Sequence, residues 1–354
     1  MNRRSFLLSC LSASASAACS IALGAALLFG ASGCKGGTST SGAASADGGA
    51  RLRIAVIPKG TTHEFWKSVH AGAIKASQDA NVDIVWKGPL KEDDLKSQID
   101  LVQSFLAQGV SGIALAPLSD TALRGPVKAA KAAKIPVVIL DSDLQGDDHA
   151  SFVATDNDAA GKLAGEEMAR LLGAQPPPRN VVVLRYQEGS ASTTHREQGF
   201  LDAIKAHSDI TVVSANQFAG ATTESAFATS ESLLAAQKAG AGGVSGVFAP
   251  NESTTFGMLL ALRKAGLAKK IHLVGFDASD KLTEALGSGD IDALVVQDPF
   301  RIGELAVKTM AQILRGENVE KRIDTGAKLV TKAGLTDPAI QSLLHPDLKK
   351  WLGE

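Results

Sequence analysis

The chain has 354 residues, 45% of them hydrophobic and 21% charged, with 36 basic against 37 acidic side chains and a formal net charge of −1. This length and apolar content are sufficient for two domains with hydrophobic cores. The balanced charge excludes the strongly basic surface that attracts nucleic acids and anionic membranes. We therefore expect a globular protein whose partner is small or neutral.

Residues 1–33 have the pattern of an export signal, in which Arg3 and Arg4 precede a run without charged residues. A transmembrane anchor is the alternative. Only IALGAALLF, residues 21–29, is strongly apolar, and that stretch is too short to span a bilayer on its own. RRSFL is similar to a twin-arginine signal, so both the general secretory route and the twin-arginine route stay open.

Cys34 is the predicted site of lipid attachment. The tetrapeptide ASGC resembles a lipobox in which Ala31 replaces the usual leucine. Cys10 and Cys19 lie inside the predicted signal, so the exported part keeps only Cys34 and can form no internal disulfide. We expect residues 34–50 to be a lipidated cysteine and a flexible tether with a reach of roughly 20–24 Å.

From Arg51 onward, short apolar runs alternate with helical patterns. The predicted strands of the first half lie at residues 54–57, 82–86, 112–117 and 135–141, and after a helix near 158–172 the pattern restarts at 180–186. Strands without polar alternation are buried on both faces, as in a parallel sheet covered by helices. We therefore predict an α/β fold of doubly wound lobes with parallel sheets.

The later strands repeat the earlier ones. VSGIALAP begins at Val110 and VSGVFAP at Val244, 134 residues apart, while IPVVILDSD begins at Ile135 and IHLVGFDASD at Ile271, 136 residues apart. Chance similarity between apolar strings explains one such match more easily than two in the same order. The repeat predicts a duplicated α/β lobe.

Asp141 and Asp277 occupy the carboxyl ends of equivalent strands in this repeat. Ligands of open α/β sheets bind outside these strand ends, so two facing lobes would direct both carboxylates into one cleft. An aspartate after a strand is also common as a helix N-cap or turn residue. The symmetric placement of the two residues favours the cleft.

Other polar and aromatic residues follow the predicted strands or begin the next helices. A sugar has apolar faces that suit aromatic side chains and a rim of hydroxyls that suits planar polar groups. Both kinds of side chain are present at these positions, namely Phe65, Trp66, Asp141, Ser142, Arg196, Asn251, Asp277 and Gln297. The set predicts a binding site for a sugar-like solute.

Residues 51 to about 335 resemble the ribose-type periplasmic substrate-binding proteins of ABC importers, relatives of the effector domains of sugar-responsive repressors. The resemblance rests on IAVIPKGTTHEFW, GIALAP, IPVVILDSD, VATDNDAAGKLAG, HREQGF, VFAPNES, LVGFD and ALVVQDP, in that order. It implies the type I fold, with two lobes joined by three crossings near Thr155, Gln297 and Gly326. The implied parts are lobe 1 at 51–155 and 298–326, lobe 2 at 156–297 and 327–340, and a C-terminal extension at 341–354.

The resemblance also implies the ligand contacts, which in this sequence are Lys59, His63, Phe65, Trp66, Asp141, Ser142, Arg196, Asn251, Asp277 and Gln297. The chain departs from the family pattern at two of them, because Lys59 replaces a small hydroxyl residue and Ser142 replaces a frequent arginine. An aromatic residue of the second lobe is missing near Ala221, a gap that Phe218 or Phe256 could fill. These departures leave the identity of the sugar open.

Three of these contacts, Phe65, Lys59 and His63, have a second interpretation. Phe65 has the helical spacing of a core residue, so Trp66, one step around the helix, is the stronger candidate for stacking on a ligand. Lys59 can bind an anionic ligand, pair with an aspartate of the cleft or extend to solvent, and the last two are favoured. His63 is expected to be a hydrogen-bonding loop residue.

We predict a monomeric protein that binds a monosaccharide by hinge closure and delivers it to an ABC permease; the alternative is an exported sensor module that presents a sugar or related metabolite to a membrane receptor. The chain has no nucleophile elbow, P-loop or dinucleotide fingerprint, so no catalytic residue, metal or cofactor is expected. No nucleic-acid partner is expected, and the lipid is the predicted membrane contact. The extension at 341–354 should pack as a short amphipathic helix on one lobe.

Overall fold

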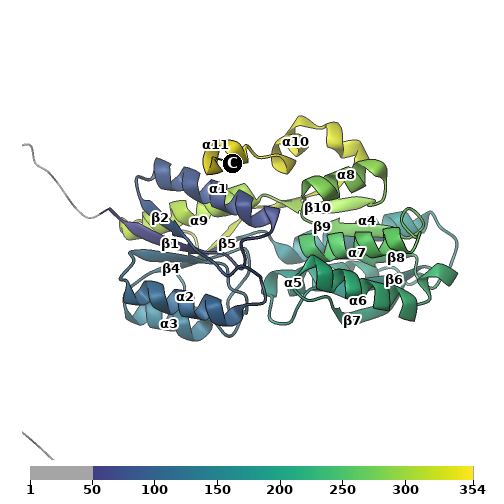
Figure 1. The fold of residues 1–354 in the computed structure, drawn as a ribbon, viewed down its shortest axis with the longest axis horizontal. Coiled ribbons are helices and arrows are strands. Elements are labelled where there is room, and N and C mark those ends of the chain that lie inside the picture. Colours follow the sequence, from purple (N-terminus) through teal and green to yellow (C-terminus); the bar gives the residue numbers. More distant parts are fainter. Residues whose placement is uncertain (1–50, 354) are drawn as a thin grey trace, which may run out of the picture. The chain divides into compact units, whose positions relative to one another are not determined.

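The computed structural model describes residues 51–353 (Figure 1). The predicted export signal, Cys34 and the tether lie outside these residues. Residues 50–354 form one compact unit, and the hydrophobic clusters described below consist of residues of this unit alone. None of the helices within 51–353 is long and apolar enough to cross a membrane.

The first lobe is built on a six-stranded sheet with the order β11-β5-β4-β3-β1-β2. Its strands are β1 (Arg53–Ile57), β2 (Asp83–Trp86), β3 (Gly112–Leu115), β4 (Val137–Leu140), β5 (Ser151–Ala154) and β11 (Arg322–Asp324). All neighbouring strands in this sheet are parallel. Helices α1 (Glu64–Asp79) and α9 (Pro299–Leu314) cover one face, and α2 (Leu95–Ala107) and α3 (Arg124–Ala132) cover the other.

The second lobe is built on a sheet with the order β12-β10-β9-β8-β6-β7. Its strands are β6 (Asn180–Arg185), β7 (Thr211–Phe218), β8 (Gly246–Phe248), β9 (His272–Phe276), β10 (Ala293–Gln297) and β12 (Ala327–Thr331). Helices α4 (Asn157–Gly173) and α5 (Ala191–Lys205) cover one face, while α6 (Thr223–Ala236), α7 (Glu252–Lys264) and α8 (Asp280–Ser288) cover the other. Because β12 runs antiparallel to β10, this sheet is mixed, whereas the other neighbouring strands are parallel as predicted.

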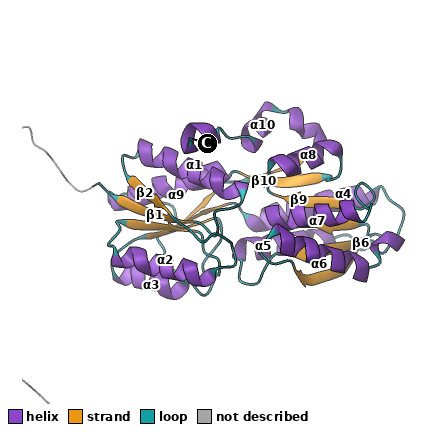
Figure 2. Ribbon diagram, in the orientation of Figure 1, coloured by secondary structure: helices purple, strands orange, loops and turns teal. Residues whose placement is uncertain are grey.

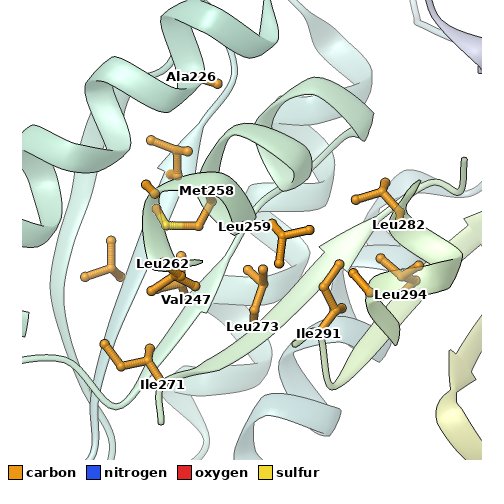
Figure 3. Packing of buried hydrophobic residues seen from close by; sticks show 14 of the residues in the cluster. Ala226, Val247, Met258, Leu259, Leu262, Ile271, Leu273, Leu282, Ile291 and Leu294 are labelled. Atoms are coloured by element: carbon orange, nitrogen blue, oxygen red, sulfur yellow. The ribbon is translucent and has the colours of Figure 1, made fainter. Parts of the chain in front are cut away.

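Burial on both faces explains why the central strands are apolar. Along β1, Ile54 and Val56 face the cluster under α1 and α9, whereas Ala55 and Ile57 face the cluster under α2 and α3. Helices therefore cover both faces of each sheet, as Figure 2 shows. In the second lobe, Met258 packs from α7 onto strands β8 and β9 (Figure 3).

The two lobes have the same strand arrangement, which confirms the predicted duplication. β3 and β8 occupy the same position in their sheets, and so do β4 and β9. These are the two pairs of strands in which the sequence repeats. Residues at matching strand ends of the two lobes are therefore structurally equivalent.

Glycines allow the same close helix contact in both lobes. A Cβ atom on Gly72 of α1 would overlap the carbonyl oxygen of Phe300 in α9. In the second lobe, a Cβ atom on Gly161 of α4 would overlap the carbonyl oxygen of Arg196, and one on Gly199 of α5 would overlap that of Asp158. Each helix pair can pack at this distance only because these positions lack a side chain.

The chain passes between the sheets after β5, after β10 and between β11 and β12. At these crossings, Thr155 Oγ1 donates a hydrogen bond to the Gly326 carbonyl oxygen at 3.1 Å, and the Asp156 amide donates to Asp324 Oδ1 at 3.0 Å. The crossing after β5 and the crossing between β11 and β12 therefore lie side by side. The lobe boundaries given above stay a prediction.

The last residues form two short helices, α10 (Pro338–Leu344) and α11 (Leu348–Leu352), after the 3₁₀ helix η2 (Lys332–Thr336); a further 3₁₀ turn, η1, spans Ala239–Ala241. Leu343 and Leu344 pack against the core of the second lobe. The Trp351 ring of α11 lies 6.3 Å from the Phe300 ring of α9 in the first lobe. The extension therefore contacts both lobes, and the expectation of one helix on one lobe was wrong.

Candidate functional site

A cavity lies at the carboxyl ends of the strands, with walls from both lobes. Nine of the ten predicted contacts line it: Lys59, His63, Phe65, Trp66, Asp141, Arg196, Asn251, Asp277 and Gln297. Five lining residues were not predicted: Glu92, Tyr186, Ser192, Thr193 and Glu252. Ser142 is fully buried behind the wall, where its Oγ accepts a hydrogen bond from the Ser192 amide at 3.1 Å.

Asp141 and Asp277 both face this cavity. Each has a positive φ, 60° and 66° respectively, a left-handed conformation in which aspartate is several-fold enriched among non-glycine residues. Neither is the N-cap residue of a helix that follows it, since the N-cap of α8 is Ser279 and Asp141 is followed by a loop; Asp277 Oδ2 does accept from the Glu252 amide at the start of α7 at 3.1 Å. Of the alternative given above, the N-cap role was therefore wrong, while the turn role is present: both residues adopt a turn conformation, and both also line the cavity.

Arg196 lies between the two carboxylates. Its guanidinium nitrogens are 4.0 Å from Asp141 Oδ1 and 3.9 Å from Asp277 Oδ2. Its Nε donates to Asn157 Oδ1 at 2.8 Å, and the guanidinium carbon is 4.0 Å from the centre of the Phe276 ring. Burial raises the pKa of Asp277, and the attraction of Arg196 opposes that rise.

Two buried polar atoms at the cavity lack a hydrogen-bond partner among the described residues. They are Nη2 of Arg196, a donor, and Oε1 of Gln297, an acceptor. The other end of the Gln297 amide is used, because Nε2 donates to Asp277 Oδ1 at 2.7 Å. Unpaired buried polar groups are costly, so both atoms are suited to a polar ligand.

Lys59 forms an ion pair within the first lobe and hydrogen bonds to the second lobe. Only 3% of its surface is exposed, and its Nζ lies 3.4 Å from Asp141 Oδ2. The same nitrogen donates to Ser190 Oγ at 3.2 Å and to Ser192 Oγ at 3.1 Å. The prediction that Lys59 could extend to solvent was therefore wrong, and the predicted ion pair of Lys59 with an aspartate of the cleft is present.

His63 and Trp66 both bind Glu92, a residue of the loop between β2 and α2. His63 Nδ1 and Trp66 Nε1 each lie 2.7 Å from Glu92 Oε1. Burial would raise the pKa of Glu92, but attraction to His63 and hydrogen bonds from His63 and Trp66 lower it to about 2. Burial would likewise lower the pKa of His63, yet Glu92 holds it at about 9.

Phe65 and Trp66 are both core residues that also line the cavity. Their rings meet edge to face, with centroids 4.9 Å apart, and both belong to the cluster under α1 and α9. The sequence predicted Phe65 on the core side and Trp66 towards the ligand. The structure does not separate the two residues in this way, because both lie in the core cluster and both line the cavity. Phe218 and Phe256 are absent from the residues that line this cavity.

Asn251 and Glu252 begin helix α7. Asn251 is the N-cap, and its Oδ1 accepts from the Thr254 amide at 3.2 Å, while its Nδ2 donates to Ser253 Oγ at 3.3 Å. Glu252 Oε2 accepts from the Phe65 amide of the first lobe at 3.3 Å. Burial raises the pKa of Glu252 to about 7 from its ordinary 4.5, although His63 opposes the rise.

The raised pKa of Glu252 predicts a pH dependence of stability. The folded state holds this proton more tightly than the unfolded state, so the contribution is complete below pH 4.5 and is lost as the pH rises through about 7. Between about pH 5 and 6.5, wild-type protein should lose about 1–2 kcal/mol of unfolding free energy relative to Glu252→Gln, measured by urea unfolding.

The range from about pH 5 to 6.5 distinguishes the titration of Glu252 from the titration of other groups with shifted pKa values. His63, with a pKa of about 9, loses its own contribution only above pH 6.5. Burial lowers the pKa of His149, so this residue titrates with the opposite sign, but it does so in both proteins and cancels in the comparison. Parallel pH profiles for wild-type and variant would contradict the prediction.

No group of three His, Cys, Asp or Glu side chains within 51–353 could hold a metal ion.

The chain matches the family model described as the periplasmic binding protein domain over residues 54–318. It is 30% identical to the ribose import binding protein of Haemophilus influenzae, covering 82% of this chain and 95% of that protein.

Solved structures of solute-binding proteins are similar as well. One from Agrobacterium vitis with bound D-fucose is 36% identical, with a TM-score of 0.77 over 83% of this chain and 100% of that one. Another, from Agrobacterium radiobacter with D-arabinose, is 33% identical, with a TM-score of 0.79 over 84% of this chain and 99% of that one. The family consists of substrate-binding transport proteins. The chain therefore belongs to the periplasmic binding proteins, as a ribose-type member with the type I fold.

Proposed function

We propose that this protein binds a monosaccharide in the interlobe cavity and delivers it to an ABC-type permease. Support comes from the relatives, whose names and bound ligands include ribose, D-fucose and D-arabinose. The observation that carries the proposal is the pair of unpartnered buried atoms, Arg196 Nη2 and Gln297 Oε1. A sugar hydroxyl can accept from the first and donate to the second.

The ligand is a neutral sugar. Lys59 lies against Asp141, and His63 lies against Glu92, so the positive charges that the first lobe contributes to the cavity are balanced within the protein. An anionic ligand would have to break one of these pairs or compete with Asp141 and Asp277 for Arg196, and it would leave buried carboxylates without their partner. A neutral ring requires no such exchange. Phe65 and Trp66 supply apolar surface for its faces.

Binding proceeds by closure of the lobes about the three crossings. Asp141 belongs to the first lobe, and Arg196 and Asp277 belong to the second, so their contacts with one solute are all available only when the lobes meet. This difference in affinity shifts the population towards the closed state. The permease would then recognise the closed form, presented by a monomer tethered through a lipid on Cys34.

A thermal-shift screen of residues 50–354 tests this function. We expect D-ribose, D-arabinose, D-fucose or another neutral sugar to stabilise the protein by about 4.1 kcal/mol at 1,000 times its dissociation constant. Sugar acids serve as the charged control and should have little effect. Asp277→Asn keeps the size and the left-handed turn, yet it should weaken binding roughly 10- to 100-fold. A screen in which no neutral sugar stabilises the protein would contradict the proposal.

A further inference from the structure

Glu92 joins the two lobes at the wall of the cavity. Besides the bonds from His63 and Trp66 to Oε1, its Oε2 accepts from the Tyr186 hydroxyl of the second lobe at 2.8 Å. The next residue of that lobe, Gln187, donates from Nε2 to the Glu92 carbonyl oxygen at 2.9 Å. One residue of the first lobe thus receives two hydrogen bonds from the second.

Tyr186 is placed for this contact by the duplicated fold. It follows β6 as Lys59 follows β1, and these strands occupy equivalent positions in the two sheets. Each of the two side chains crosses to the opposite lobe, Lys59 to Ser190 and Ser192, and Tyr186 to Glu92. Only 1% of the Tyr186 surface is exposed. Both side-chain contacts therefore belong to the buried interface between the lobes.

The hydrogen bond between Tyr186 and Glu92 depends on lobe closure, whereas those from His63 and Trp66 lie within the first lobe. When the lobes separate, Tyr186 leaves and water can replace it at Oε2. Bonds to an ionised carboxylate are among the stronger hydrogen bonds in proteins. The bond therefore favours the closed state, and the bond from Trp66 fixes the orientation of an indole that lines the cavity.

We propose that Glu92 is a positioning residue for ligand binding, which holds the closed state through Tyr186 and orients Trp66. The proposal rests on the proposed function only in that closure traps a ligand. A residue with a merely structural role would affect the stability of the ligand-free protein. A closure contact instead affects the rate at which a bound ligand leaves.

The first test needs no sugar. Residues 50–354 contain no cysteine, and Ser142 contacts Ser192 across the lobes, so Ser142→Cys with Ser192→Cys offers a disulfide that locks the closed state. Loss of free thiol reports its formation. Tyr186 is the single tyrosine of the chain, so absorbance at 295 nm follows this phenol alone.

In the closed state, burial raises the pKa of Tyr186 well above 10, and the charges of Glu92, Asp93 and Asp141 add to the rise. We expect the oxidised protein to titrate at higher pH than the reduced protein. Adding Glu92→Gln should lower the oxidised midpoint by at least about one pH unit. Equal midpoints with and without Glu92 would overturn the proposal.

The second test measures kinetics with D-fucose, D-arabinose and D-ribose as probes. Tyr186→Phe removes one hydroxyl and should raise the dissociation rate roughly 10- to 100-fold, with association and ligand-free stability nearly unchanged. An unchanged dissociation rate with lower ligand-free stability would overturn the proposal. If no neutral sugar of the screen binds, the proposed function fails, while the tyrosine titration still decides whether Glu92 contacts Tyr186 when the lobes are closed.

Discussion

Replacing Arg196 by alanine should abolish sugar binding and lower the free energy of unfolding by about 3–5 kcal/mol. Arg196 is 2% exposed and lies between Asp141 and Asp277, so its removal leaves two buried carboxylates facing each other. The change to alanine also removes Arg196 Nη2, the buried donor that has no hydrogen-bond partner among the described residues. Urea unfolding and calorimetric titration with the sugar found in the screen measure the two effects.

Arg196→Lys is the matched control for this change. Lysine keeps the positive charge and should restore much of the stability, but it lacks the planar fork and should bind sugar poorly. The stability lost in Arg196→Ala should partly return at acid pH, because Asp277 already has a raised pKa and will then be neutral. An alanine variant with wild-type affinity would show that Arg196 is not part of the site.

Gly72→Ala should destabilise the first lobe by about 3 kcal/mol or more. The added methyl group would overlap the Phe300 carbonyl oxygen, and backbone atoms on two packed helices cannot move aside separately. Alanine is otherwise the better helix former by up to about 1 kcal/mol, so a loss must come from the helix contact. Urea unfolding of the ligand-free protein measures it.

Gly173→Ala is the control for that substitution. Gly173 ends α4, and a methyl group added there would have no neighbouring atom within 4 Å, so alanine should leave stability unchanged or raise it slightly. If Gly72→Ala behaved like Gly173→Ala, then the close packing of α1 on α9 would not be required for the fold.

Much of the fold is predictable from the sequence because its central strands are buried on both faces. Continuous apolar runs such as 54–57 and 112–115 are typical of such strands, and the repeated strings mark β3 with β8 and β4 with β9. Strand β7 was not predicted, since it is an edge strand with mixed polar residues and little burial. Pairing directions, as for β12, depend on tertiary contacts.

The site residues that the sequence predicted best are those at equivalent strand ends of the two lobes and those at the first residues of helices. Asp141 and Asp277 stand at matching strand ends, and both reach the cavity. Glu92 was missed because a charged residue in a polar loop has the sequence pattern of a solvent-exposed one, and only tertiary contacts with His63, Trp66 and Tyr186 bury it. The equivalence of β1 and β6 is the pattern that could have identified Tyr186.

A crystal structure of the protein with the sugar found in the screen would test binding between the lobes most directly. We expect the sugar in the interlobe cavity, with hydroxyls within hydrogen-bond distance of Arg196 Nη2 and Gln297 Oε1. A sugar bound elsewhere, for example in the cavity that Phe300 and Trp351 line beside the C-terminal extension, would contradict this proposal.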